Sequence, residues 1–164
     1  MIEISKPKVE VQDIVEGGES RFIAEPLERG FGQTLGNSLR RILLGALPGA
    51  APVGVRITGV NHEFSTIEGV KEDVTEMILN IKGLAVKAHT DDRNFKQIMT
   101  IRKYDAGVVT AADIEHSSDI EILNPDMYIC TLDDGAKLEM DITVGVGRGY
   151  VSAQDNKDDT QPIG

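Results

Sequence analysis

The sequence predicts an α+β fold of mainly antiparallel strands with two helices. Short segments of alternating apolar and polar residues recur along the chain, and turn-forming residues separate them. Two longer segments instead repeat apolar residues every three to four positions, as an amphipathic helix does. Apolar residues make up 40% of the chain and aromatic residues only 4%, so the core must consist mostly of Val, Ile and Leu.

The N-terminal part is predicted to form a hairpin followed by a helix. Apolar and polar residues alternate over 9–14, the Gly17-Gly18-Glu19 sequence is a turn signal, and residues 20–24 read as the returning strand. Residues 25–32 contain several helix-breaking residues and are predicted to be a loop. The helix itself is predicted from about Gln33 to Leu47.

The remainder of the chain is predicted to be rich in strands and to carry one helix. That helix runs from about Val70 to Lys82 on an i, i+4, i+7, i+8, i+11 apolar stripe, and Gly83 is expected to be its C-cap. The predicted strands are residues 53–57, 84–89, 95–102, 120–123, 127–132 and 137–146. Asp133-Asp134-Gly135 is expected to join the last two as a hairpin. The polar tail from Ser152 is expected to be a flexible loop or chain end.

Bulk properties restrict the function. The net charge of −10 argues against direct grip on nucleic acid, which usually needs a basic face. The single cysteine excludes a disulfide framework and a thiolate metal cluster, and fits a reducing cytosol. Neither a signal peptide nor an apolar run of membrane-spanning length is visible, so we expect a soluble cytoplasmic protein without a membrane partner.

Few residues suggest chemistry. The three histidines (His62, His89 and His116) are scattered, and His62-Glu63, if on a strand, would point to opposite faces. Cys130 lies in an apolar strand and is expected to be buried. The glycines of 145–149 invite comparison with a phosphate loop, but their spacing is wrong and no helix is expected to follow, so a flexible strand exit is favoured. We expect no catalytic residue, no metal and no cofactor.

The helix predicted near Gln33–Leu47 is unusual because it has two candidate interaction surfaces. Leu35, Leu39, Ile42 and Ala46 fall close together on a helical wheel, and Leu43 and Leu47 widen the arc to about 140°. So wide an arc could serve both the core and a second surface, such as an identical helix of another copy. On the far side, Asn37, Arg41 and Leu44 cluster. They form either a patch for protein contacts or a scattered leucine on an ordinary surface.

One long sequence motif resembles the signature of a known protein family. Residues 27–44, LERGFGQTLGNSLRRILL, resemble the signature of the bacterial RNA polymerase alpha subunit family. The resemblance continues at residues 62–66, 69–73, 79–86, 109–114 and 147–151, and so spans nearly the whole chain. Two other hypotheses come from different classes: a small nucleotide-binding protein that uses the 145–149 loop, and a stand-alone homodimeric structural module.

The resemblance implies a non-catalytic assembly subunit of a nucleotidyltransferase. In that family two copies dimerise through the N-terminal domain, and the dimer is the platform for the beta and beta-prime subunits. Residues 1–48 would be the first half of a discontinuous dimerisation subdomain, a hairpin plus a helix. Residues 49–164 would be an inserted, mainly antiparallel β-rich subdomain that carries one helix.

The resemblance also assigns site residues. Phe31, Leu35, Leu39 and Ile42 match dimer-facing positions of the family. Arg41 and Leu44, with Asn37 beside them on the wheel, match positions that contact the beta subunit, and Lys82 matches one linked to beta-prime. Family members continue past Gly164 into more of the dimerisation part and a DNA-binding domain. The resemblance therefore implies a half-built dimer face and no direct DNA binding by these residues.

Overall fold

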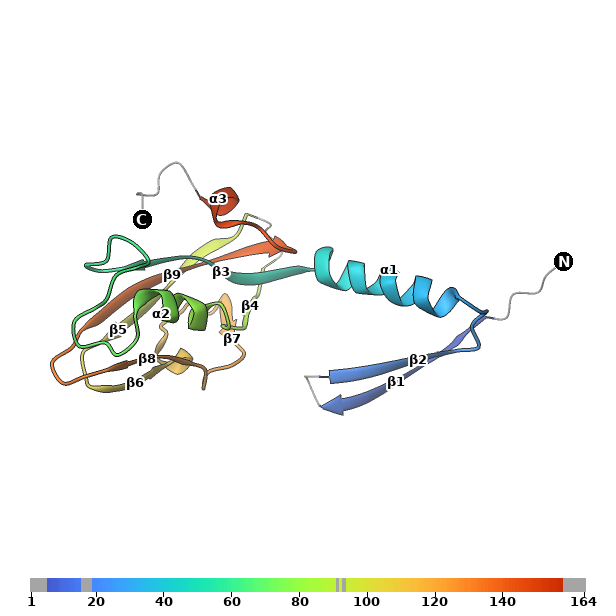
Figure 1. The fold of residues 1–164 in the computed structure, drawn as a ribbon, viewed down its shortest axis with the longest axis horizontal. Helices are drawn as coiled ribbons and strands as arrows, with labels where there is room; N and C mark the ends of the chain where they lie inside the picture. Colours follow the sequence, from blue (N-terminus) through green and yellow to red (C-terminus); the bar gives the residue numbers. More distant parts are fainter. Residues whose placement is uncertain (1–5, 16–18, 91, 93, 158–164) are drawn as a thin grey trace. The chain divides into compact units, whose positions relative to one another are not determined.

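The computed structural model describes residues 6–15, 19–90, 92 and 94–157. The chain divides into two compact units, Met1–Ala46 and Leu47–Gly164, which we call the N-terminal unit and the C-terminal unit. Figure 1 shows their elements. The predicted α+β class with mainly antiparallel strands is confirmed. Over the described residues, no helix has the length and apolar character that crossing a bilayer requires.

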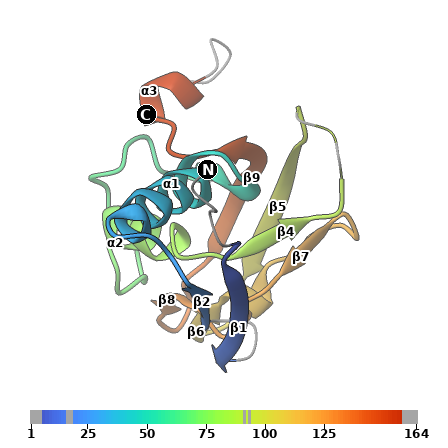
Figure 2. The same cartoon turned by 90° about the vertical axis from the view of Figure 1, so that its right-hand side faces the viewer.

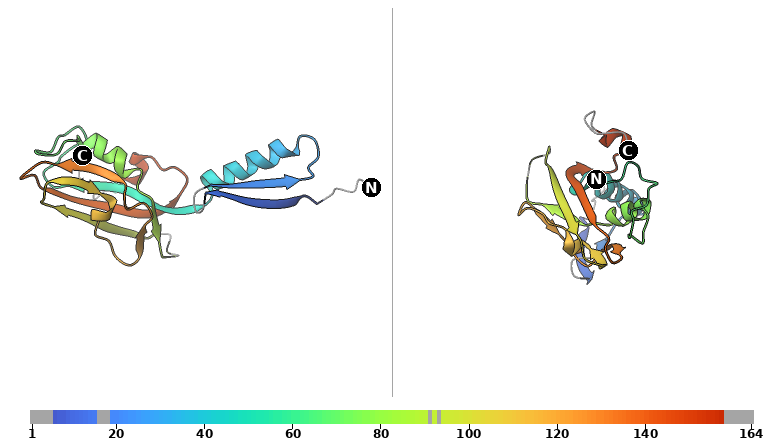
Figure 3. Two further views of the ribbon diagram at one scale, coloured as in Figure 1. Left: turned by 90° about the horizontal axis from the view of Figure 1, so that it is seen from below. Right: turned by 90° about the vertical axis from the view of Figure 1, so that its left-hand side faces the viewer.

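The N-terminal unit contains the predicted hairpin and helix. Strand β1 (Lys8–Val15) pairs antiparallel with β2 (Glu19–Glu25), while the predicted turn at Gly17-Gly18 lies outside the described residues. Helix α1 (Phe31–Gly45) follows and runs alongside the hairpin (Figures 1 and 3). The predicted helix start at Gln33 was two residues too late. The N-cap is Gly30, which has a φ of 92°. Glycine adopts this left-handed conformation without steric cost, so it can end the loop where the helix begins.

The C-terminal unit is built on a five-stranded sheet in the order β5-β9-β3-β4-β7. Its strands are β3 (Pro48–Ile57), β4 (Val86–Ala88), β5 (Lys96–Lys103), β7 (Ile120–Ile122) and β9 (Leu138–Arg148). A second, two-stranded sheet pairs β6 (Gly107–Thr110) with β8 (Tyr128–Leu132). The helical elements are α2 (Val74–Ile81), the 3-10 turn η1 (Ala111–Asp113) and α3 (Ala153–Asn156). Figure 2 shows the same ribbon in a view turned by 90°.

One aliphatic core fills the C-terminal unit. Strand β9 contributes Leu138, Met140, Ile142 and Val144, all with an exposed fraction of 0%. These residues alternate along the strand, so they share one face of the sheet. Side chains from α2, β5 and β8 join the same cluster. The core is aliphatic, as expected, because no described aromatic side chain is buried.

The second helix begins later than the sequence predicts. Helix α2 starts at Val74, since the carboxylate of Asp73 accepts a hydrogen bond from the Glu76 N–H at 2.7 Å and caps the first turn. Val70, which completed the apolar stripe, instead forms an isolated β-bridge with Leu132. The predicted Gly83 C-cap is also wrong. Lys82 is the C-cap, in a right-handed conformation with a φ of −61°.

The predicted hairpin between the last two long strands is also wrong, although its turn exists. Gly135 has a φ of 82°, and the Ala136 N–H donates to the Asp133 carbonyl at 3.1 Å. The strands then diverge, because β8 pairs with β6 while β9 pairs with β3 and β5. The sequence showed no pattern over 104–119, where β6 and η1 lie. The tail was expected to be irregular, but residues 153–156 form α3, whose first turn Ser152 caps.

The segment before α2 is held against β8 by a buried carboxylate. The Tyr128 hydroxyl donates to one oxygen of Glu72, and the Thr131 N–H donates to the other at 2.7 Å. Only 5% of Glu72 is exposed, and it is the one buried charged residue among those described. This clamp fixes the start of α2 and therefore the position of Lys82 at its end.

The clamp determines the protonation of both side chains. Burial raises the pKa of the Glu72 carboxyl, but the hydrogen bonds from Tyr128 and Thr131 outweigh burial and leave the pKa below its usual value. Burial and the Glu72 carboxylate raise the pKa of the Tyr128 hydroxyl. Glu72 is therefore the acceptor and Tyr128 the donor at neutral pH.

A glycine allows the close approach next to this clamp. Gly69 has a φ of 74°, and its carbonyl accepts from the Asp133 N–H at 2.8 Å. A Cβ at Gly69 would lie 2.7 Å from the Cβ of Ala136, which is far inside van der Waals contact. Gly59 has a similar φ of 83°, but a Cβ there would meet nothing within 4 Å.

These two glycines provide a matched test. We expect Gly69→Ala to lower the free energy of unfolding by at least about 2 kcal/mol, because it combines backbone strain with a steric clash. Gly59→Ala carries the backbone strain alone and should cost about 1 kcal/mol. Urea denaturation of each variant measures the two costs. Equal costs would contradict the close approach at Ala136.

The clamp also predicts a pH dependence. Because the folded-state pKa of Glu72 is lowered, its contribution to stability is present above the ordinary value of 4.5 and is lost as the pH falls through the folded-state value. We expect Tyr128→Phe to cost about 1–3 kcal/mol at pH 7 and to weaken this acid sensitivity. Urea titrations from pH 3 to pH 7 measure both effects.

Tyr104→Phe is the control for that experiment. The Tyr104 hydroxyl also donates to a carboxylate, Glu139, at 2.9 Å, but the tyrosine is 52% exposed. Its loss should cost under about 1 kcal/mol, because water replaces an exposed partner. A cost for Tyr128→Phe no larger than that of Tyr104→Phe would show that the buried clamp does not stabilise the fold.

Candidate functional site

Helix α1 is exposed along its whole length. Its 15 residues follow the N-cap Gly30, which has no side chain with which to cap the helix. Its C-cap is Ala46, whose N–H donates to the Ile42 carbonyl at 2.9 Å, and β3 begins two residues after Ala46. No residue of α1 is buried. An isolated helix of this length is marginal in water, so α1 requires a covering surface.

The apolar arc of α1 is uncovered. The predicted dimer-facing residues Phe31, Leu35, Leu39 and Ile42 have exposed fractions of 57%, 40%, 49% and 52%. None of these side chains joins the buried cluster of the described residues. Large apolar side chains grouped in this way on one helix mark a surface that another chain or segment covers. Their assignment to self-association stays a prediction.

The opposite side of α1 combines polar and apolar groups. Asn37, Arg41 and Leu44 are spaced by four and three residues on a continuous helix, so they lie on one face. Leu44 is 64% exposed, and Asn37 and Arg41 are also exposed. Among the described residues, no hydrogen bond or ion pair of Arg41 is observed. The guanidinium is therefore available to an external carboxylate or carbonyl.

Lys82 belongs to the other unit. It is exposed, and as the C-cap of α2 its N–H donates to the Ile78 carbonyl at 3.0 Å. The predicted site residues therefore fall on two separate units, with seven on α1 and one at the end of α2. Sequence reasoning missed the apolar neighbour Leu79, which lies one turn before Lys82 and is 60% exposed. The sequence pattern places Leu79 on the helix, but it does not reveal that the side chain is exposed.

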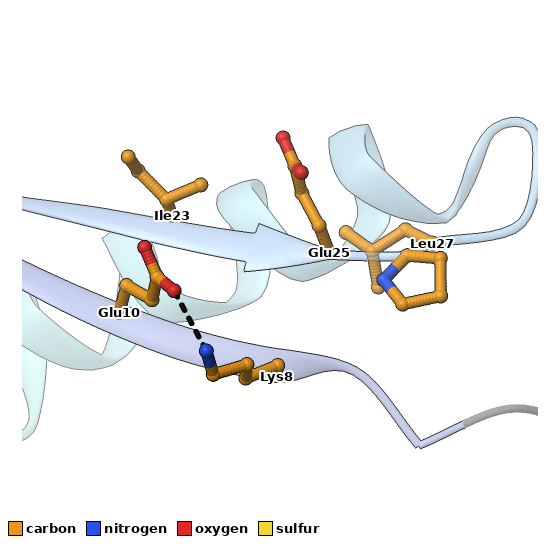
Figure 4. Close-up of a pocket in the computed structure, with 6 residues that line it drawn as sticks. Lys8, Glu10, Ile23, Glu25 and Leu27 are labelled. Atoms are coloured by element: carbon orange, nitrogen blue, oxygen red, sulfur yellow. Dashed lines mark hydrogen bonds and ion pairs between the residues drawn. The ribbon is translucent and has the colours of Figure 1, made fainter.

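Two surface hollows lie among the described residues, and neither gathers catalytic groups. One open hollow of about 580 Å³ lies on the hairpin and is lined by Lys8, Glu10, Ile23, Glu25, Pro26 and Leu27 (Figure 4). Its Lys8 Nζ lies 2.9 Å from Glu10 Oε1, an exposed ion pair of little energetic weight. A second hollow of about 400 Å³ lies where β3 and β4 separate. Over the described residues, no three His, Cys, Asp or Glu side chains gather as metal ligands would.

The other residues considered for a chemical role are Cys130, the glycines of 145–149 and His62, and none of them forms a reactive site. Cys130 is buried in β8, and desolvation raises the pKa of its thiol to about 12, so it is not a nucleophile at neutral pH. The interpretation of 145–149 as a flexible strand exit is wrong, because Gly145 and Gly147 lie within β9, opposite Ala51 and Gly49 of β3, and only Gly149 follows the strand. The helix that comes next, α3, has only four residues and begins after Ser152. His62 is in a loop and not on a strand, with its Nδ1 3.2 Å from Ser65 Oγ.

Comparison with known proteins gives concordant matches. The family model described as RNA polymerase Rpb3/RpoA insert domain matches residues 55–164. Proteins named DNA-directed RNA polymerase subunit alpha from Alkaliphilus metalliredigens and Moorella thermoacetica are each 56% identical, and one from Bacillus velezensis is 55% identical. Each match covers 100% of this chain and 51% or 52% of the relative. The chain thus spans about half the length of the curated relatives it matches.

Proposed function

The chain belongs to the family of the RNA polymerase Rpb3/RpoA insert domain, and from this premise we propose that it is a non-catalytic assembly part of a bacterial DNA-directed RNA polymerase. The names of relatives that match it over its whole length support this proposal. Two copies associate through α1 and scaffold the beta and beta-prime subunits. On this proposal the chain acts in the bacterial cytoplasm, and DNA contact is left to other parts of the polymerase.

One observation carries the proposal: α1 is a fully exposed helix with two chemically different sides. A helix of a monomeric protein normally buries one side, because tertiary packing supplies most of its stability. The apolar arc of Phe31, Leu35, Leu39 and Ile42 bears no charge and can pack against an identical arc. The other side remains available to a second kind of partner, as a scaffold requires.

We assign that second side to the beta subunit. The helix carries two arginines and no acidic residue, although the net charge of the chain is −10. The planar guanidinium of Arg41 can form two parallel hydrogen bonds to a carboxylate, and Leu44 beside it offers an apolar anchor. Arginine and large apolar residues are enriched in the centres of protein interfaces. Asn37 adds an amide that can donate or accept at the edge of the patch.

Lys82 is assigned to the beta-prime subunit. It lies on the C-terminal unit, whereas Arg41 lies on the N-terminal unit, and this separation is consistent with two different partners. The exposed Leu79, one turn away, would supply the apolar part of the contact. The exposed ammonium of Lys82 would offer a cation for a carboxylate on the partner to recognise.

Arg41→Ala tests the first contact. We expect the variant to lose about tenfold to a hundredfold in affinity for the beta subunit, because truncating a buried interface arginine leaves its partner unpaired. Stability should change by less than about 0.5 kcal/mol, since Arg41 is exposed. Pull-down with purified beta, together with circular dichroism, measures both. Arg29→Ala, an exposed arginine before α1, is the control, and unchanged capture by Arg41→Ala would exclude this assignment.

Lys82→Ala tests the second contact. We expect it to weaken incorporation of beta-prime into the assembly while beta is still captured, because the two partners use different units. Arg41→Ala should show the reverse selectivity. Size-exclusion chromatography of reconstituted mixtures, with each subunit quantified, distinguishes the two. If both variants lost the same subunit, the two-surface scaffold would be wrong.

A further inference from the structure

The backbone directly after Lys82 is held at two points by one side chain, that of Asn124. The amide nitrogen of Asn124 donates to the Gly83 carbonyl at 2.9 Å, and its amide oxygen accepts from the Ala85 N–H at 2.8 Å. The two hydrogen bonds enclose Leu84, which is only 5% exposed. We call this pair of hydrogen bonds the Asn124 bracket. It fixes the segment that leaves the C-cap of α2.

The Asn124 bracket continues the pairing of β4 with β7. Next to that ladder, the Leu123 N–H donates to the Ala85 carbonyl at 2.9 Å. The backbone then turns away, because the Met127 N–H donates to the Asn124 carbonyl at 3.1 Å and closes a turn. A carboxamide offers a donor and an acceptor, as a peptide group does. The side chain of Asn124 therefore replaces the backbone hydrogen bonds that the turn removes.

The turn that carries the bracket is itself anchored to a buried element. The Pro125 carbonyl accepts from the Ala112 N–H, and the Met127 carbonyl accepts from the Ala111 N–H, each at 2.9 Å. These two alanines belong to η1, and Ala111 has an exposed fraction of 0%. The bracket therefore ties the end of α2 to the buried core of the C-terminal unit.

The end of α2 lacks the cap that helices commonly have. Such a cap is a glycine in the left-handed conformation, but Gly83 is not among the described glycines with a positive φ. A Cβ at Gly83 would lie 3.2 Å from the Asn80 carbonyl oxygen and 3.4 Å from the Met127 Sδ, so the segment is closely packed. The Asn80 Nδ2 also donates to the Ile129 carbonyl at 2.9 Å. Side-chain amides thus hold this helix end in place of a glycine cap.

We propose that Asn124 is a positioning residue for the partner contact of Lys82, because its bracket fixes the backbone that carries the lysine before the partner binds. The inference rests on the proposed contact of Lys82 with beta-prime and adds the residue that orients it. A lysine side chain loses rotamer entropy on binding, and disorder of the backbone beneath it would add to this cost. Asn124 raises the affinity by preorganisation and does not itself touch the partner.

Two substitutions of Asn124 test the positioning. Asn124→Ala removes both hydrogen bonds, whereas Asn124→Asp keeps the size and the acceptor but replaces the donor that faces the Gly83 carbonyl. We expect each to weaken incorporation of beta-prime by about tenfold, while capture of beta stays unchanged. Size-exclusion chromatography of the full 164-residue chain reconstituted with beta and beta-prime measures both. Tyr104→Phe is the control, since it breaks a side-chain hydrogen bond at the opposite edge of the five-stranded sheet.

A double-mutant cycle separates positioning from a general loss of stability. When Asn124→Ala is added to Lys82→Ala, we expect no further loss of beta-prime, because the lysine that the bracket positions is already absent. General destabilisation would instead lower incorporation by the same factor whether or not Lys82 is present. An equal effect of Asn124→Ala in both backgrounds would overturn the proposal.

Hydrogen exchange of the chain alone tests the bracket without any partner. The Ala85 amide should exchange faster in Asn124→Ala, because it loses its acceptor, while the amides of β9 should keep their protection. Unchanged exchange at Ala85 would show that the bracket does not hold the segment.

The Lys82→Ala and Asn124→Ala results together separate this inference from the proposed function. Loss of beta-prime in both variants supports both. Loss in Lys82→Ala alone keeps the proposed contact and overturns the positioning role of Asn124. Loss in Asn124→Ala alone, or in neither variant, overturns the assignment of Lys82 and this inference with it, while capture of beta through Arg41 still tests the scaffold function independently.

Discussion

The double pairing of β9 holds the C-terminal unit together. This strand forms ladders with β3 on one side and β5 on the other, and one of its faces supplies four fully buried side chains. The α2 helix, the second sheet and the Glu72 clamp all pack onto the cluster that β9 begins. Because burial of apolar surface is the dominant favourable term in folding, this unit has the means to fold alone. The position of Lys82 follows from it.

The N-terminal unit follows the opposite principle. Its hairpin and helix form regular hydrogen bonds, but their apolar faces remain open. Backbone hydrogen bonds contribute little net stability when water can replace them, so geometry alone does not stabilise this unit. The C-terminal unit buries its apolar side chains, whereas the N-terminal unit exposes them. The proposed function would give this arrangement a purpose, since an assembly subunit needs a rigid part and a part completed by its partners.

The sequence predicted most elements but not their connections. Alternation identified the hairpin, and the helical wheel identified both sides of α1. Asp73 and Glu76 have the spacing of an N-cap and its partner, which marks the start of α2 at Val74. The predicted start was too early because Val70, the apolar residue of a β-bridge, also fits the apolar stripe of the helix. The Asp133-Asp134-Gly135 turn fitted a hairpin, and only the packing of β8 against β6 shows otherwise. Exposure depends on tertiary packing, so no local pattern could reveal that the apolar side chains of the hairpin and Leu79 are exposed.

The open leucines of α1 also bear on how a cell would handle the newly made chain. Grouped exposed apolar side chains are the feature by which chaperones and proteases detect unassembled polypeptides, and exposed strand edges add a risk of aggregation. A copy without partners carries this mark along its whole first helix. Surplus copies would therefore be removed or would aggregate, so their lifetime would depend on the supply of partners. These side chains would be exposed in copies that lack partners and buried after assembly, so their exposure would indicate that the copies are in excess.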